Sequence, residues 1–147
     1  MMDTSKEYIE MCEKAVEIQK SWKAKEGDFY SALVPYGFTG RIETKKPSIY
    51  VFKFIEGVNN LEVCNKCGIW LPRQDQLQEI LIKHLNLRLE TSTTSIWLAL
   101  NFARFCTPET GEGNTNVAIR KGSMEQLWLA YMMQEKYNKK WDGKDWK

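Results

Sequence analysis

Cys64 and Cys67 carry the sharpest chemical signal in the sequence, because two residues separate them in the run VCNKCG. A tight turn of this kind can bring two thiolates to one zinc ion at about 2.3 Å. A closed zinc site needs two further ligands, which would have to come from Cys12, Cys106 or His84 on separate elements. The alternatives are a redox dithiol and, as we expect, two cysteines at the end of a hairpin without a metal.

The first turn of the helix that follows Pro72 could bind an anion or a planar group. Arg73, Gln74 and Gln78 would project from it, where free backbone N–H groups and the positive end of the helix dipole favour negative charge. Glutamine amides can read the edge of a nucleobase or a peptide, and Trp70 could stack beside them. The competing interpretation is that the glutamines form the solvated face of a helix and that Trp70 belongs to the core.

The segment EKYNKKWDGKDWK near the C-terminus combines lysines with aromatic rings. Lys136, Lys140 and Trp141 in such a segment could neutralise phosphates and stack on bases. Acidic residues in the same segment dilute this positive charge. The competing interpretation is a solvated helix end whose tryptophans fold back onto the domain.

Sequence motifs of catalysis are absent. No serine stands in a Gly-x-Ser-x-Gly elbow, and the glycine-rich loops that bind nucleoside triphosphates or dinucleotides do not occur. His84 is the single histidine, and near the end of a predicted helix it would interact with the helix dipole. The sequence therefore leans against an enzyme and favours a protein that acts by binding.

The elements that must position these residues follow from hydrophobic periodicity and from helix caps. Apolar residues at three- and four-residue spacing predict a helix from about residue 5 to Trp22. Aromatic and β-branched runs then predict strands within 29–34, 48–57 and 61–71 of a small antiparallel sheet. Helices are predicted over 72–85, with Pro72 in the first helical position, over 96–106 and over 123–140. An N-terminal helix, about three strands and three C-terminal helices make an α+β fold.

Two of these helices carry specific expectations. The helix over 96–106 contains only two polar residues, Asn101 and Arg104, so we expect it at the centre of the core. The last helix begins with Ser123 and has Gln126 three residues later, which is the pattern of a capping box. Because 147 residues is about one domain, we expect the whole chain, 1–147, to form a single domain.

The composition is that of a soluble globular protein, with 43% hydrophobic and 27% charged residues. The 21 basic and 19 acidic residues give a net charge of +2, which is too small for an electrostatic footprint on nucleic acid. No window reaches the roughly 18 apolar residues of a membrane span, and the first residues lack the apolar run of a signal peptide. We therefore expect a cytoplasmic protein, with no role for a membrane, whose cysteines are reduced.

Three ordered motifs resemble a family of small uncharacterised proteins from tailed phages and prophages of Gram-positive bacteria. The motifs are EIQKSWKAKEGDFY, WLPRQDQLQEIL and SMEQLWLAYMMQEKYNKKWDGKDW, and together they cover about a third of the chain. The family that these motifs resemble has no assigned catalytic residues, so the resemblance carries no functional residue over to this chain. The chain departs from the family pattern in the longer segment 35–67, which includes the cysteine pair, and in 85–106, where an individual member could have acquired its own partner.

We therefore expect a non-enzymatic accessory protein that binds a host or phage macromolecule in the cytoplasm of the host bacterium. A host or phage protein is the expected partner, and inhibition of a host immune system, or counter-defence, is one form of this function. Two alternatives stay open, which are sequestration of a nucleotide-like ligand in an aromatic pocket and a zinc-stabilised module that binds nucleic acid. We expect no cofactor unless Cys64 and Cys67 hold zinc.

Overall fold

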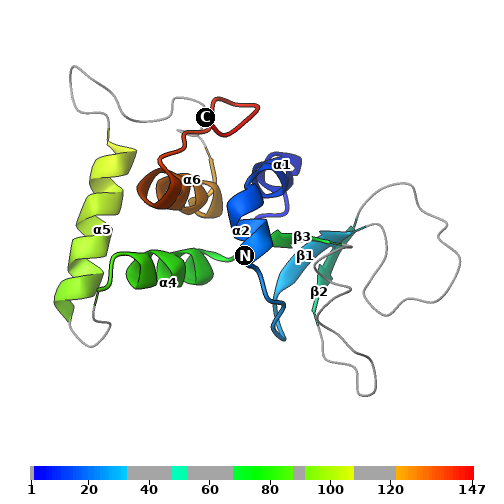
Figure 1. Cartoon of the computed structure of the whole chain (residues 1–147), viewed down its shortest axis with the longest axis horizontal. Coiled ribbons are helices and arrows are strands. Elements are labelled where there is room, and N and C mark those ends of the chain that lie inside the picture. The colour runs from blue at the N-terminus through cyan, green and yellow to red at the C-terminus, as the bar shows by residue number, and fades with distance from the viewer. Residues whose placement is uncertain (1, 33–47, 53–67, 88–91, 108–121) are drawn as a thin grey trace, which may run out of the picture. The chain divides into compact units, whose positions relative to one another are not determined.

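The computed structural model describes residues 2–32, 48–52, 68–87, 92–107 and 122–147 (Figure 1). Its contacts divide the chain into two compact units. We name Thr4–Pro72 the sheet unit, and Met1–Asp3 together with Arg73–Lys147 the helical unit. Helices and an antiparallel sheet confirm the predicted α+β class, whereas the single domain stays a prediction. None of the described helices is long and apolar enough to cross a membrane.

The sheet unit begins with two short helices, where the sequence predicted a single helix. α1 spans Lys6–Lys14, and the Oγ of its N-cap Ser5 accepts a hydrogen bond from the Tyr8 backbone N–H at 3.2 Å. α2 spans Val16–Ser21. Ala15 between the two helices has a ψ angle of 64°, which lies outside the helical range and interrupts the helix. Hydrophobic spacing continues through this break, so periodicity alone does not reveal it.

The Gln19 side chain connects the two helices to the sheet. Its Nε2 donates a hydrogen bond to the Cys12 carbonyl at 3.0 Å. The same nitrogen donates to the Trp70 carbonyl at 3.0 Å, and the Gln19 Oε1 accepts from the Trp70 backbone N–H at 2.9 Å. The amide therefore pairs with both backbone groups of Trp70, as the backbone of a neighbouring strand would.

The sheet has three described strands, with β1 (Phe29–Ala32) between β2 (Ser48–Val51) and β3 (Ile69–Leu71). Both pairings are antiparallel, which confirms the predicted small antiparallel sheet. The other residues of the predicted strands, 33–34, 53–57 and 61–67, lie outside the described residues.

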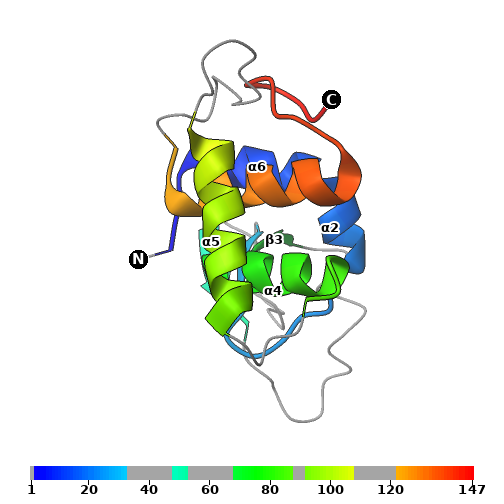
Figure 2. The same ribbon diagram turned by 90° about the vertical axis from the view of Figure 1, so that its left-hand side faces the viewer.

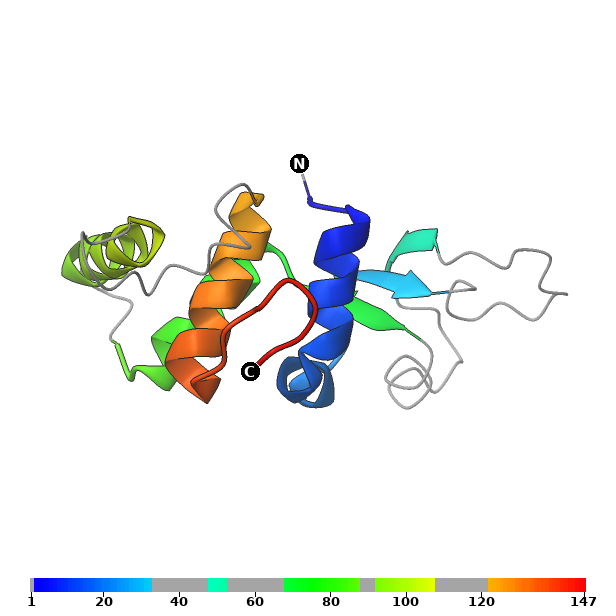
Figure 3. The ribbon, with the colours of Figure 1, turned by 90° about the horizontal axis from the view of Figure 1, so that it is seen from above.

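Aromatic side chains join the helices and strands of the sheet unit. The rings of Trp22 and Trp70 stack in parallel, with 5.9 Å between their centroids. Trp22 Nε1 also donates to the buried Asp28 carboxylate at 2.9 Å. α1 packs against β3 (Figure 3), and the Tyr8 hydroxyl donates to the Pro72 carbonyl at 2.5 Å. These contacts give the EIQKSWKAKEGDFY motif a structural role.

The helical unit contains α4 (Gln74–His84), α5 (Ser92–Cys106) and α6 (Met124–Tyr137). These helices correspond to the three predicted C-terminal helices. α4 begins later than predicted, because Arg73 has extended backbone angles and acts as the N-cap, so that Pro72 lies before the helix. The Gln76 Oε1 accepts a hydrogen bond from the Arg73 backbone N–H at 2.9 Å and fixes this start.

The start of α6 is held by three side chains. Ser123 Oγ accepts a hydrogen bond from the Gln126 backbone N–H at 3.2 Å, which confirms Ser123 as the N-cap of the predicted capping box. The Gln126 Nε2 donates to an oxygen of Asp3 at 3.0 Å, and Ser123 Oγ donates to the same oxygen at 2.5 Å. The Asp3 carboxylate thus lies at the positive end of the α6 dipole, where negative charge is stabilising.

α6, rather than α5, is the most buried helix of the helical unit, contrary to the prediction. It buries Gln126 and every residue from Trp128 to Met133, and α4 packs against it. α5 runs across α6 (Figure 2) and buries Leu98 and Phe102. Its apolar composition does not distinguish a central helix from a helix that is covered on one side.

Candidate functional site

The first turn of α4, which the sequence predicted as an anion site, contains an internal ion pair. Arg73 Nε lies 3.0 Å from Asp75 Oδ1, and Arg73 Nη2 donates to Asp75 Oδ2 at 3.1 Å. The hydrogen bond from Arg73 holds the pKa of the Asp75 carboxyl below its usual value. Because the guanidinium already has this bidentate partner, an anion at the turn has to compete with the Asp75 carboxylate.

The other residues predicted at this site fall into different units. Gln74 and Gln78 are half-buried, four residues apart on α4, and belong to the helical unit. Trp70 belongs to the sheet unit, where its side chain is 6% exposed and stacks on Trp22. Trp70 is therefore a core residue of the sheet unit, and its ring face is not available at the surface.

The C-terminal segment forms a short hairpin that contains the predicted Trp141. Lys140 N donates to the Lys147 carbonyl at 2.7 Å, and Lys147 N donates to the Lys140 carbonyl at 2.9 Å. Trp141 is 1% exposed, and its ring centroid lies 5.0 Å from that of Trp146, which is also buried. Burial of both rings agrees with the interpretation in which the tryptophans fold back, rather than with bases stacking on Trp141.

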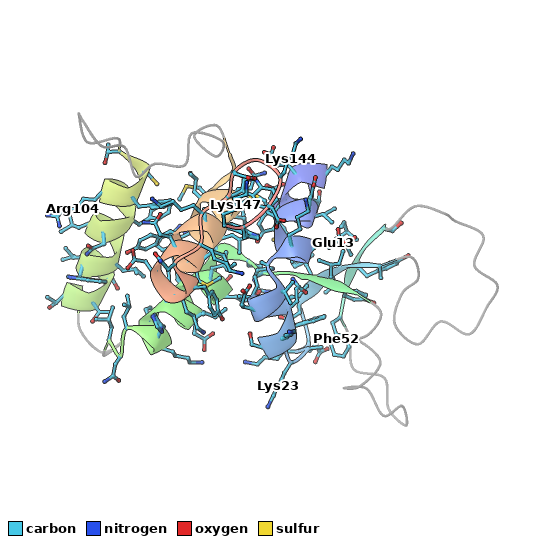
Figure 4. All side chains as sticks on the ribbon, turned by 45° about the horizontal axis from the view of Figure 1, so that its top comes forward. Glu13, Lys23, Phe52, Arg104, Lys144 and Lys147 are labelled. Atoms are coloured by element: carbon cyan, nitrogen blue, oxygen red, sulfur yellow. The ribbon has the colours of Figure 1, made fainter. Side chains whose placement is uncertain are left out.

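The lysines of this segment are partly neutralised within it. The Lys147 ammonium forms an ion pair with Asp142 of the same hairpin. Figure 4 labels Lys144 and Lys147 on this hairpin. The hydrogen bond with Lys147 lowers the pKa of Asp142 and raises the pKa of Lys147. Lys140 is exposed, and the half-buried Lys136 has its Nζ 5.3 Å from the centroid of its neighbour Tyr137. The predicted phosphate-binding role of Lys136 and Lys140 stays a prediction.

The metal-site prediction concerns residues that are only partly described. Cys64 and Cys67 lie outside the described residues. Cys12 is fully buried in the sheet unit, and Cys106 is a half-buried free thiol whose pKa is raised by burial. Among the described residues, no group of three or more His, Cys, Asp and Glu side chains could hold a metal ion. His84 lies at the end of a helix, as predicted, because it is the last residue of α4, and it is exposed.

An exposed apolar surface on α5 was not predicted from the sequence. We name it the α5 stripe, and its members are Thr93, Ile96, Trp97, Leu100, Ala103, Arg104 and, just after the helix, Thr107. All of these side chains are exposed, and at about 100° per residue they lie within about 60° of Leu100 around the helix axis. Ile96 is 59% exposed, Trp97 41% and Leu100 55%. Three large apolar side chains therefore lie side by side at the surface.

The opposite side of α5 is covered by α6. The Phe102 ring stacks on Trp128 with 3.9 Å between centroids, and the Phe105 centroid lies 5.2 Å from that of Tyr131. α5 thus has one apolar side that is buried within its own unit and a second apolar side that is exposed. Apolar residues repeat at three- and four-residue spacing on both sides of α5, and this repeat does not show which of the two sides is covered.

The stripe is almost uncharged. Residues 92–107 contain no Asp or Glu, and Arg104 is their only basic residue. Figure 4 shows Arg104 pointing away from α6. An apolar surface of this kind, bordered by polar residues, is typical of protein–protein contacts. Comparisons of the chain with protein-family models, with curated proteins and with solved structures found no match.

Proposed function

We propose that the protein is a non-catalytic accessory protein of phage or prophage type, and that it acts by binding a protein partner that covers the α5 stripe. The observation that carries this proposal is the exposure of Ile96, Trp97 and Leu100 on a helix whose other side is already packed. From their exposed fractions, these three residues present on the order of 300 Å² to solvent, which is the size of the largest apolar patch on a typical monomer, a patch that is often functional.

The energetics of the stripe support docking of a partner. At about 25 cal/mol per Å², covering roughly 300 Å² contributes roughly 7 kcal/mol of gross hydrophobic free energy. Association itself costs about 4–15 kcal/mol in lost freedom of motion. The three large residues therefore offset much of that cost, and the surrounding residues of the stripe supply the remaining contact area. Tryptophan, which the stripe contains at Trp97, is also enriched among the residues that dominate binding free energies.

A protein partner fits the stripe better than a nucleic acid does. Binding to a phosphate backbone relies on several lysine or arginine contacts, and the stripe offers Arg104 alone. The net charge of the whole chain is only +2. The phage or prophage type rests on the three resembling sequence motifs, and inhibition of a host defence protein is a role that such a binding protein would suit.

Site-specific photo-crosslinking in bacterial cells tests the proposal. A photoreactive amino acid would replace Leu100 in the stripe and, as the matched control, Ser95, which is exposed on the same helix but outside the stripe. We expect a covalent adduct with a protein from position 100 and none of comparable yield from position 95. Equal yields at both positions, or no adduct from either, would contradict the proposed function.

A substitution tests the same surface without a probe. Leu100→Glu places a charge in the middle of the stripe. It should lower the affinity for the partner by at least 100-fold, because a buried unpaired carboxylate costs several kcal/mol. Since Leu100 is 55% exposed, the melting temperature should stay close to that of the wild type. Ser95→Glu is the matched control and should leave binding unchanged.

A further inference from the structure

We infer that the peptide group between Pro72 and Arg73 is a joint through which the two units stabilise each other, and that Tyr8 holds this joint. The chain passes from one unit to the other at two places, between Asp3 and Thr4 and between Pro72 and Arg73. The joint is independent of the proposed function, because no residue of the α5 stripe takes part in it.

One hydrogen bond from each unit holds this peptide group. The Pro72 carbonyl accepts from the Tyr8 hydroxyl, in the sheet unit, at 2.5 Å. The Arg73 N–H donates to the Gln76 Oε1, in the helical unit, at 2.9 Å. Because a peptide group is planar and stiff, a bond that fixes its carbonyl also fixes the direction of its N–H. An amide that accepts at its oxygen is also polarised, which strengthens the bond that its N–H donates.

Burial makes the bond from Tyr8 costly to lose. The side chains of Tyr8 and Pro72 are both fully buried. A phenylalanine at position 8 would keep the ring but leave the Pro72 carbonyl without this donor in a buried setting. The proline ring also fixes the φ angle of Pro72, so the carbonyl has little freedom to turn toward another donor.

Tyr8 lies close to the other passage of the chain as well. Its backbone N–H donates to Ser5 Oγ at 3.2 Å, just after the passage between Asp3 and Thr4. Before that passage, the Asp3 carboxylate accepts hydrogen bonds from the helical unit. A hydrogen bond from Tyr8 is therefore found next to both places where the chain changes unit. The hydroxyl serves only one of them, so that passage can be tested alone.

The first turn of α4 is the part of the helical unit that depends on the joint. Arg73 is the N-cap of α4, and the Leu77 N–H donates to the Arg73 carbonyl at 3.1 Å, which is the first backbone hydrogen bond of the helix. If the Arg73 N–H loses its direction, the cap loosens and this bond opens more often. The corresponding bond of α6, from the Leu127 N–H to the Ser123 carbonyl at 3.0 Å, is a reference within the same unit.

Hydrogen exchange of the full chain carrying Tyr8→Phe, followed by NMR, tests the joint. The substitution removes the hydroxyl and keeps the ring and the backbone N–H. The Leu77 amide should exchange at least about tenfold faster than in the wild type, and the Leu127 amide less than about twofold faster. Tyr50→Phe, which removes a hydroxyl from β2 of the same sheet unit, is the matched control and should change neither amide by more than about twofold.

A substitution in the helical unit tests the joint from the other side and leaves the buried Tyr8 in place. Gln76→Ala removes the acceptor of the Arg73 N–H, and an energetic coupling acts in both directions. The NMR signal of the Tyr8 ring carbon that carries the hydroxyl should therefore shift toward that of a weaker hydrogen bond. Gln78→Ala, at another half-buried glutamine of α4, is the matched control and should leave this signal unchanged.

Three results would overturn the joint. If exchange at Leu77 is unchanged in Tyr8→Phe, the hydroxyl serves the sheet unit alone. If Leu77 and Leu127 accelerate to the same extent, the substitution weakens the fold as a whole rather than the start of α4. If Tyr8→Phe does not fold, the Tyr8 signal in Gln76→Ala decides, and an unchanged signal rejects the coupling.

Discussion

Replacing Gln19 by alanine should destabilise the sheet unit by about 3 kcal/mol. The substitution removes the hydrogen bonds of the side-chain amide to the Trp70 N–H, to the Trp70 carbonyl and to the Cys12 carbonyl. The Cys12 carbonyl keeps a hydrogen bond from the Ala15 N–H at 3.2 Å, so losing the bond from Gln19 costs little at this carbonyl. The two Trp70 groups lose their partner in a partly buried setting, which costs about 1–3 kcal/mol for each group.

Gln19→Glu makes the reasoning sharper, because it has nearly the same shape as the wild type. A glutamate can still accept from the Trp70 N–H, but it has no N–H to donate. Its negative charge would face the carbonyls of Trp70 and Cys12, which are 3.0 Å from the wild-type Nε2. We therefore expect Gln19→Glu to destabilise the sheet unit at least as much as Gln19→Ala at neutral pH.

Urea unfolding followed by tryptophan fluorescence measures this effect, because Trp22 stacks on Trp70 beside the Gln19 contact. The midpoint should fall while the slope of the transition stays unchanged, since the same surface is exposed on unfolding. Lys20→Ala, at an exposed position of the same helix, is the matched control and should change stability by less than about 0.5 kcal/mol. If Gln19→Ala costs no more than Lys20→Ala, the Gln19 amide does not hold β3.

Further expectations concern α6, the pH dependence and metal content. Ser123→Ala should destabilise the helical unit by about 1 kcal/mol through loss of the α6 cap. In urea unfolding, the effects of Ser123→Ala and Asp3→Ala should not add in the double variant, because the two side chains share a hydrogen bond. Burial and, secondly, the charge of Glu135 raise the pKa of Tyr131 to about 12. The folded state therefore binds the Tyr131 hydroxyl proton more tightly than the unfolded state does. The resulting contribution to the free energy of unfolding is full below pH 10 and is lost between about pH 10 and 12. Between pH 9 and pH 11, the free energy of unfolding should fall less for Tyr131→Phe than for the wild type. An equal fall would show that Tyr131 is not the group responsible. Metal analysis of protein purified without chelator should find no stoichiometric zinc; one zinc per chain that disappears in Cys64→Ser would contradict this.

Local signals predicted much of the fold. Short aromatic and β-branched runs predict the strands within 29–34, 48–57 and 61–71, and their described parts form the predicted antiparallel sheet. The cap of α6 was recognised from Ser123 and Gln126, three residues apart, because both partners of a cap lie within one turn. The break at Ala15 was missed, since the apolar spacing continues across it and the stabilising contact comes from Trp70, 51 residues away from Gln19.

The candidate site was less accessible to sequence reasoning. The ion pair between Arg73 and Asp75 is local and could have been anticipated from opposite charges two residues apart. The exposure of Leu100 could not have been anticipated, because the sequence pattern of an apolar residue is the same whether its side of the helix is covered or open. Trp70 illustrates the converse, since only its contacts in the folded sheet unit show that a tryptophan beside a polar turn is a core residue.

The hydrogen bond between Asp3 and Ser123 has a consequence for the order of events during translation. The residues of the helical unit come from both ends of the sequence, and 120 positions separate these two partners, whereas the sheet unit is continuous. At ribosomal rates of about 5–20 residues per second, Asp3 waits roughly 6–24 s before Ser123 has been synthesised. The sheet unit can therefore fold while the helical unit is still incomplete, and the α6 start is closed only near the end of synthesis.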